Sequence, residues 1–322
     1  MQITSYKPEH LPEMAALFAE NFKRLRASVP ILPDAMESRD RVVEYLSGMF
    51  PEHCPGVVAL DGGRVAGYMG WWLVDEFRGT DRKAAYCNEW AHAAAGDKKP
   101  GIYRAMYRAA SGLWFDAGCE THALTLLAHD LQAVDTWFWN GFGLTGVDAI
   151  RPIDPLNVEA SAGITIRKAT VADVEMLAVL ELEHEQHYLA PPVLMVVYEP
   201  QDAAALTTFL NEPSNSIWLA LSGDEPVGYL RFEANSFGAA TIVDASDKIA
   251  CTGAFIRPQQ RGRGVAASLL DAALKDYAAQ GYRRCSVDFE SFNPEAVAFW
   301  MKHFTPVCLS LIRVPERRVS GT

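Results

Sequence analysis

The sequence has little positive charge for its length. Its 322 residues include 29 Lys and Arg against 40 Asp and Glu, so the formal net charge at pH 7 is −11. A nucleic-acid-binding surface needs a basic patch, and this balance therefore argues against nucleic acid as a partner. The same balance mildly favours a cationic acceptor such as an amine through electrostatic steering, although ordinary solubility also accounts for it.

Metal-ligand spacing and long apolar runs are also missing. Six cysteines are scattered along the chain, and none belongs to a Cys-x-x-Cys pair or to a His/Cys cluster. We therefore expect no metal site and expect most cysteines to be reduced core residues. The first residues show no signal-peptide pattern, and no run of about 18 apolar residues could span a membrane. These absences predict a cytoplasmic protein without a membrane partner.

The order of the predicted elements repeats after about 160 residues. The positions that align at one offset of 163 are Gly101 with Gly264, Gly118 with Gly281, Ala133 with Ala296, and Trp137 with Trp300. Hydrophobic residues make up 49% of the chain, enough for the full core of a soluble globular protein. We therefore predict two copies of one domain, at 1–155 and 163–322, joined by a linker that contains Pro, Asn, Ser and Gly.

The segment Cys251–Ala272 carries the most informative pattern. The apolar run Ala254-Phe255-Ile256 predicts a buried strand, which Pro258 ends because proline has no N–H for a sheet ladder. A glycine-rich turn, Arg261–Ala267, then leads into a helix predicted over 265–280. Free N–H groups at a helix N-terminus, the helix dipole and small glycines together favour an anion such as a phosphate.

The pattern Arg261-x-x-Gly264-x-Ala266 resembles the pyrophosphate loop of the GNAT family of N-acetyltransferases. It has neither the glycine spacing of a dinucleotide fingerprint nor the Lys-Ser/Thr pair of a P-loop. A strand at 284–289 follows, and then a helix with Asn293-x-x-Ala296-x-x-Phe299-Trp300, where the family shows Asn-x-x-Ala-x-x-Phe-Tyr. The resemblance covers roughly residues 163–310. It implies an α/β (α+β) fold of two tandem GNAT-like domains, each a mixed, twisted sheet flanked by helices.

The resemblance also implies acetyl-CoA as the acyl donor. In the family, the strand before the loop pairs with the pantetheine arm, and the N–H groups of the loop bind the pyrophosphate. Asn293 matches an asparagine that contacts the cofactor. The residues expected at the cofactor are Ala254, Phe255, Ile256, Arg261, Gly262, Arg263, Gly264, Val265, Ala266, Ala267, Asn293 and Trp300.

The chemistry that the resemblance implies is direct transfer of an acetyl group to the amine of a small-molecule acceptor. A base or a water chain must take a proton from the ammonium, because only the neutral amine attacks. Asp288 matches the position of the base in some family members. Glu290, on the same predicted strand, and Glu233, at the end of another, are the alternatives.

Two departures from the family pattern leave catalysis open. Trp300 stands where the family has a tyrosine as general acid, and an indole N–H cannot supply a proton at neutral pH. The acid is then Tyr229 or Tyr188, or none is needed because the thiolate leaves as such. The usual glycine is also missing before Phe304. The alternatives to an acetyltransferase are a non-catalytic acyl-CoA-binding or regulatory protein and an acyltransferase that uses another acyl-CoA.

The first copy departs further from the loop pattern, with Lys98-x-x-Gly101-x-Tyr103. Pro100 removes a backbone donor, and Tyr103 puts a large ring where a small residue lets the pyrophosphate approach. Asp130 stands at the position of Asn293 and adds negative charge. We therefore expect a degenerate copy without cofactor binding. Two domains in one chain would mimic a family dimer, which is consistent with a monomer.

Two histidines lie near the end of the first helix of the second copy. The family uses this region to line the acceptor pocket, so His184 and His187 are hypotheses for groups that contact the acceptor. Two histidines without further ligands do not make a metal site.

Overall fold

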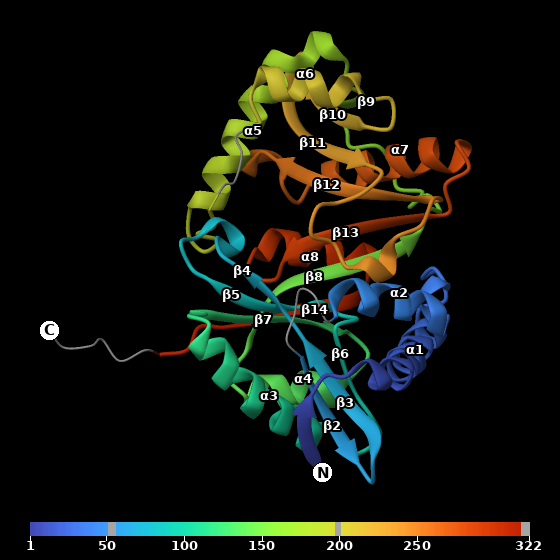
Figure 1. Cartoon of the computed structure of the whole chain (residues 1–322). Helices are drawn as coiled ribbons and strands as arrows, with labels where there is room; N and C mark the ends of the chain where they lie inside the picture. Colours follow the sequence, from blue (N-terminus) through green and yellow to red (C-terminus); the bar gives the residue numbers. More distant parts are fainter. Residues whose placement is uncertain (51–55, 197–200, 317–322) are drawn as a thin grey trace, which may run out of the picture. The chain divides into compact units, whose positions relative to one another are not determined.

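The computed structural model describes residues 1–50, 56–196 and 201–316, which divide into two compact units (Figure 1). The first unit holds Met1–Val147, Ala240–Ile242 and the described residues from Pro306 onward, and the second holds Asp148–Ala239 and Val243–Thr305. Both contain mixed sheets flanked by helices, which confirms the predicted α/β fold.

The second unit is built on one twisted sheet with the strand order β13-β12-β11-β10-β9. Its elements are β9 (Ile164–Lys168), α5 (Val174–Leu189), α6 (Ala203–Asn211), β10 (Ser216–Ser222), β11 (Glu225–Glu233), β12 (Lys248–Ile256), α7 (Val265–Ala279), β13 (Arg284–Glu290) and α8 (Pro294–His303). The neighbouring strands are antiparallel except β12 and β13, which run parallel.

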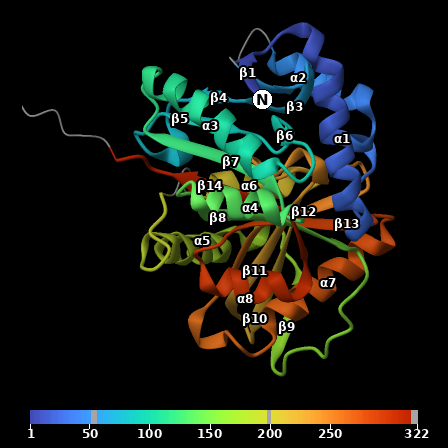
Figure 2. The ribbon, with the colours of Figure 1, turned by 90° about the horizontal axis from the view of Figure 1, so that it is seen from below.

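Alternation along β10 sorts the helices onto the two faces of this sheet. Ile217 and Leu219 belong to an apolar cluster with Leu177 of α5. Ser216 points the other way, with its hydroxyl 2.7 Å from the hydroxyl of Tyr277 on α7. Successive side chains of a strand face opposite sides, so α5 and α7 cover opposite faces, as Figure 2 shows.

The first unit holds two groups of paired strands, β1-β2-β3-β6 and β4-β5-β7-β14. Its elements are β1 (Gln2–Ser5), α1 (Leu11–Ser28), α2 (Arg39–Met49), β2 (Gly56–Asp61), β3 (Arg64–Gly70), β4 (Trp72–Val74), β5 (Ala84–Cys87), β6 (His92–Ala94), α3 (Lys99–Asp116), β7 (Thr121–Leu127), α4 (Leu131–Trp139), the first half of β8 (Gly143–Pro152) and nearly all of β14 (Thr305–Arg313). Trp114, Trp137 and Leu311 lie in its apolar core.

The element bounds repeat along the chain, as the sequence predicts. Helix α5 begins at Val174, 163 residues after α1 begins at Leu11, and β13 begins at Arg284, 163 residues after β7 begins at Thr121. The compact units do not follow this repeat throughout. Strand β14 is the last element of the second copy, yet it pairs antiparallel with β7 in the first unit, from Cys308↔Leu127 to Arg313↔His122.

The described cysteines are buried thiols, as expected of core residues. They are Cys87, Cys119, Cys251, Cys285 and Cys308, while Cys54 lies outside the described residues. Within residues 1–50, 56–196 and 201–316, no three His, Cys, Asp or Glu side chains gather as metal ligands would. In the same ranges, no helix combines the length and the apolar character needed to cross a membrane.

Candidate functional site

Strands β12 and β13 pair along only part of their length. Their parallel register runs from Lys248↔Arg284 to Cys251↔Val287, while β12 continues to Ile256 and β13 to Glu290. On its other side β12 stays paired with β11 as far as Ile256. Beyond Cys251, the described part of β13 therefore offers the rest of β12 no ladder partner. A strand edge of this kind can add an extended ligand through backbone hydrogen bonds.

A β-bulge redirects β12 where the two strands part. The register with β11 passes from Arg231↔Gly253 to Phe232↔Cys251, so Thr252 has no opposite residue. The guanidinium of Arg231 holds this residue, with Nε donating to Thr252 Oγ1 at 3.2 Å and Nη2 donating to its carbonyl at 3.1 Å. Bulges of this kind concentrate beside functional sites, where they re-aim the strand.

The loop that leads from β12 into α7 requires its glycines. Gly262 has φ of +74° and Gly264, the N-cap of α7, has φ of +83°, a conformation that other L-residues avoid. The first N–H groups of α7, from Val265 to Ala267, have no acceptor within the helix, and the helix dipole adds positive charge there. Arg263 is exposed at the same loop. This arrangement favours a bound anion.

The Arg261 side chain is bonded to two other parts of the protein at this loop. Its Nε donates to the carbonyl of Ile256 at 3.0 Å, and its Nη1 donates to Glu295 Oε1 at 2.9 Å. The side chain thus ties the end of β12 to the start of α8. Any effect of Arg261 on an anion comes from its charge and from this positioning.

The two predicted positions on α8 also have contacts within the protein. Asn293 is 7% exposed and caps the helix, with its side-chain oxygen accepting from the N–H of Ala296 at 3.3 Å. Trp300 is 4% exposed, and its ring packs against Phe299 and Phe304 at centroid distances of 4.7 and 5.3 Å. Both residues shape the start and the buried face of α8.

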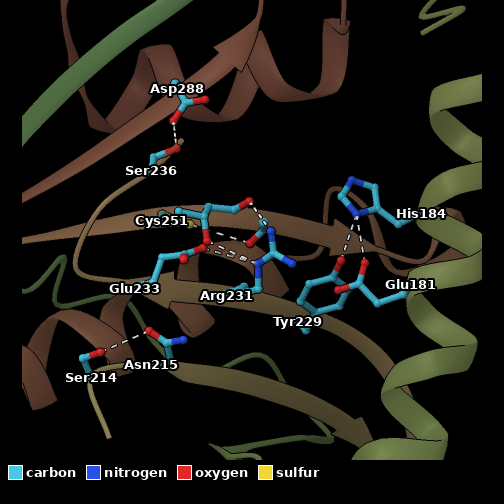
Figure 3. A network of polar contacts seen from close by, with 12 residues as sticks. Glu181, His184, Ser214, Asn215, Tyr229, Arg231, Glu233, Ser236, Cys251 and Asp288 are labelled. Atoms are coloured by element: carbon cyan, nitrogen blue, oxygen red, sulfur yellow. Dashed lines mark hydrogen bonds and ion pairs between the residues drawn. The ribbon is translucent and has the colours of Figure 1, made fainter. Parts of the chain in front are cut away.

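The predicted catalytic carboxylates lie on β13 and β11. Asp288 is reachable by solvent and accepts a hydrogen bond of 2.6 Å from the hydroxyl of Ser236 (Figure 3). Desolvation by the surrounding protein raises the pKa of Asp288, and the Ser236 hydrogen bond opposes this rise. Glu233 Oε1 lies 4.0 Å from Arg231 Nε, and Glu290 is partly buried. A carboxylate with a raised pKa is a better proton acceptor.

Tyr229 belongs to a buried network with His184 and Glu181 (Figure 3). Its hydroxyl lies 2.8 Å from His184 Nδ1 and also bonds the Glu181 carboxylate. Burial lowers the pKa of His184 to about 3, so the imidazole is neutral at physiological pH. Burial raises the pKa of Tyr229 well above its usual value, which makes it a poor proton donor to a leaving group.

Tyr188, the other candidate acid, is influenced by the charge of the predicted base. It is partly exposed, and its pKa is raised first by burial and then by the charges of Glu290 and Asp288. The centroid of its ring lies 4.5 Å from the centroid of the His184 ring. His187 is partly exposed on the same turn of α5.

Three residues of this face escaped the sequence analysis. Arg231 and Ser236 become visible only when the sheet brings them to Thr252 and Asp288. Glu181 had a signal, because it occupies a buried position of α5 between Leu180 and His184, where an apolar residue is expected.

The corresponding place in the first unit is filled by side chains. Lys99, 6% exposed, makes a buried ion pair with Asp130, and Asp130 also caps α4 through the N–H of Ala133. The Tyr103 hydroxyl lies 3.3 Å from His92 Nδ1, and its ring packs against Trp137. The cavity that remains beside Tyr103, His92 and Asp130 measures about 10 Å³, about the space of one water molecule.

Comparison with known proteins identifies the second copy. Residues 176–304 match the model of the acetyltransferase (GNAT) family. This part of the chain is a GNAT domain. The GNAT domain contains α5, the diverging strands and the loop into α7, and its family makes the protein an acyltransferase.

The fold likeness extends over the whole chain, beyond the GNAT domain. The chain is similar to the crystal structure of a GCN5-related N-acetyltransferase from Sphaerobacter thermophilus, with a TM-score of 0.61 and 16% identity over 100% of this chain and 98% of that one. It is also similar to a tandem GNAT protein from the clavulanic acid biosynthesis pathway, with a TM-score of 0.50 and 16% identity over 97% and 98% of the two chains. At these identities the likeness shows the fold alone, a tandem GNAT arrangement. No curated protein sequence matches the chain.

Proposed function

We propose that the GNAT domain transfers an acetyl group from acetyl-CoA to the amine of a small molecule. The observation that carries this proposal is the course of the chain from β12 into α7. The free edge of Ala254–Ile256 would pair with the pantetheine arm as an added strand. The N–H groups from Gly262 to Ala267 would donate to the pyrophosphate, and the glycines let it approach the backbone.

The predicted base fits the needs of this reaction. Asp288 takes a proton from the acceptor's ammonium, and the neutral nitrogen attacks the thioester carbonyl. The C–S bond then breaks to release CoA thiolate, and the excess proton of the acylated nitrogen passes to solvent, which leaves a neutral amide. Tyr188, neutral at physiological pH, stabilises the thiolate with a hydrogen bond. We favour Tyr188 over Tyr229 because Tyr188 is partly exposed, whereas the Tyr229 hydroxyl is held in the buried network.

We also propose that the first copy binds no acetyl-CoA. The ion pair of Lys99 with Asp130 and the ring of Tyr103 occupy the positions that Gly262, Asn293 and Ala266 hold in the second copy.

Calorimetric titration of acetyl-CoA into the intact chain tests both proposals, with Gly264→Ala and Gly101→Ala as a matched pair. At Gly264 an added Cβ meets the positive φ and lies 3.3 Å from the hydroxyl of Ser161, whereas at Gly101 it meets nothing within 4 Å. We expect one site per chain, weakened roughly tenfold or more by Gly264→Ala and unchanged by Gly101→Ala.

The other outcomes are equally informative. Two sites would show that the first copy still binds the cofactor. An absence of binding would refute acetyl-CoA as the donor, and the same titration with longer acyl-CoAs would then identify another donor.

A further inference from the structure

The linker between the two copies lies along helix α7 of the GNAT domain. The N–H of Asn157 donates to Asp271 Oδ1 at 2.8 Å, and the N–H of Ser161 donates to Ser268 Oγ at 3.2 Å. Ser268 Oγ in turn donates to the carbonyl of Glu159 at 3.4 Å. These contacts fix the linker backbone to one side of the helix that follows the glycine-rich loop.

The two helix positions that hold the linker are polar and buried. Ser268 and Asp271 are each 5% exposed, and residues three apart lie on the same face of a helix. Buried polar side chains need hydrogen-bond partners. The linker backbone supplies them, together with Lys275, whose Nζ lies 2.6 Å from Asp271 Oδ2. The linker is therefore a specifically packed element of the GNAT domain.

From this position the linker reaches the turn before α7. Ser161 Oγ donates to the carbonyl oxygen of Arg263 at 2.9 Å. In a planar trans peptide, the C=O and the N–H of the next residue point in opposite directions. Because the Arg263 carbonyl points at Ser161, the N–H of Gly264 points away from the linker. Gly264 is exposed, and none of the backbone hydrogen bonds of the described residues uses its N–H, so a ligand can receive it.

Glycine alone does not fix this orientation of the peptide. Gly264 has φ of +83°, but glycine adopts negative φ about as readily, so the peptide between Arg263 and Gly264 can turn over at little steric cost. The turned peptide would direct the carbonyl oxygen of Arg263 toward a bound anion, where the two would repel each other. The hydrogen bond from Ser161 stabilises the orientation that presents the N–H.

We propose that Ser161 is a positioning residue for the cofactor, because its hydroxyl holds the Arg263–Gly264 peptide with the Gly264 N–H directed at the pyrophosphate of CoA. The inference rests on the proposed function, from which it takes the ligand. Ser161 acts through the peptide and contacts neither the ligand nor the reacting atoms. The linker thereby takes part in cofactor binding as well as joining the two copies.

Calorimetric titration of CoA into the wild-type protein and Ser161→Ala tests this role. The loss of one neutral hydrogen bond that holds the peptide should weaken CoA binding roughly 3- to 10-fold. Ser214→Ala is the matched control, because Ser214 is exposed and its hydroxyl bonds the side chains of Glu212 and Asn215. We expect the control to bind CoA as the wild type does. Equal affinities of the wild type and Ser161→Ala would overturn the inference.

A second ligand separates positioning of the loop from a general disturbance of the site. Pantetheine is the part of CoA that lacks the pyrophosphate, and its affinity is measured from its competition with CoA. We expect Ser161→Ala to leave the pantetheine affinity unchanged, because the Gly264 N–H is directed at the pyrophosphate. An equal loss of affinity for both ligands would mean that Ser161 has only a structural role, and the inference would fall.

These measurements need neither an acceptor nor a chemical step, so the inference and the proposed function can fail separately. A wild-type protein that binds CoA more tightly than Ser161→Ala, yet acetylates no amine, would refute the acetyltransferase and keep the role of Ser161. Acetylation by a wild-type protein whose CoA affinity equals that of Ser161→Ala would have the opposite meaning. A wild-type protein that binds no CoA would overturn both.

Discussion

The two copies differ most at the turn into their third helix, where the second copy has glycines and the first has larger side chains. The second copy keeps Gly262, Gly264 and Ala266, and its first helical N–H groups have no acceptor within the helix. The first copy begins α3 at Lys99 and fills the corresponding space with an ion pair and Tyr103. These side chains of the first copy are the basis of our proposal that it binds no acetyl-CoA.

The strand beside this turn differs as well. In the second copy β12 is continuous, with one bulge at Thr252, and it can present an edge to a pantetheine arm. In the first copy the corresponding stretch is broken into β5 and β6, which pair in different groups of strands. A broken strand offers no continuous row of backbone groups, which supports the proposed loss of binding.

The largest effect is expected from breaking the ion pair that fills the first copy. Lys99→Met leaves Asp130 buried without its partner, and we expect about 3–5 kcal/mol less unfolding free energy. Acetyl-CoA affinity should stay the same if, as we propose, only the second copy binds it. Lys98→Met is the control, since the Lys98 side chain is 84% exposed and should contribute almost nothing. Chemical denaturation and calorimetry would check both, and a lost affinity would contradict the division of roles.

A smaller effect, in activity, should follow from replacing the proposed base. Asp288→Asn is expected to lower kcat roughly 100-fold at saturating acceptor with no change in acetyl-CoA binding. The first copy has Thr125 at this position, so the fold itself does not require the carboxylate. Unchanged turnover would remove Asp288 from the mechanism and bring forward Glu290 and Glu233.

The variant Ser236→Ala tests the assignment of Asp288 as the base through the pH dependence of kcat. The hydroxyl lowers the pKa of Asp288, so its removal should raise that pKa further. Only the deprotonated base works, and the acid limb of the kcat profile should therefore move to higher pH. A profile that does not move would show that another group controls this limb.

The smallest effect concerns Asp173, the N-cap residue of α5. Asp173 accepts from the Thr170 N–H at 2.8 Å, and hydrogen bonds from Arg167 lower its pKa to about 2. Because the folded-state pKa is depressed, this stabilisation is present above the unfolded value of about 3.9 and is lost as the pH falls towards 2. The first copy uses His10 here, with Nδ1 accepting from Lys7 N–H at 3.1 Å.

We therefore expect Asp173→Asn to cost about 1–2 kcal/mol of unfolding free energy at pH 7, after allowance for the partly exposed Arg167. The difference from wild type should shrink between about pH 4 and pH 2. Denaturation at several pH values measures it, and a difference that persists at pH 2 would show that the carboxylate charge is not the cause.

Local chemistry made the main elements predictable from the sequence. The glycines at 262 and 264 need positive φ, and the order of apolar runs sets the strands and helices, so the loop and its flanks appear where the sequence places them. Contacts between residues far apart in the chain could not be predicted from the sequence. Nothing near Arg261 in sequence indicates its bond to Glu295, and Asn293 matches a cofactor motif while its side chain caps α8. Glu181 was overlooked because its meaning depends on neighbours from another strand.

Because of strand β14, the bounds of the sequence repeat differ from the bounds of the compact units. Leu311 lies in the core of the first unit with Trp114 and Trp137, and Leu309 packs against this core, although both belong to the end of the second copy. A chain cut in the linker would leave the first half with the edge of β7 unpaired and those tryptophans partly uncovered. The first copy therefore depends on the second for its fold, whatever it binds, because a strand from the end of the chain completes its core.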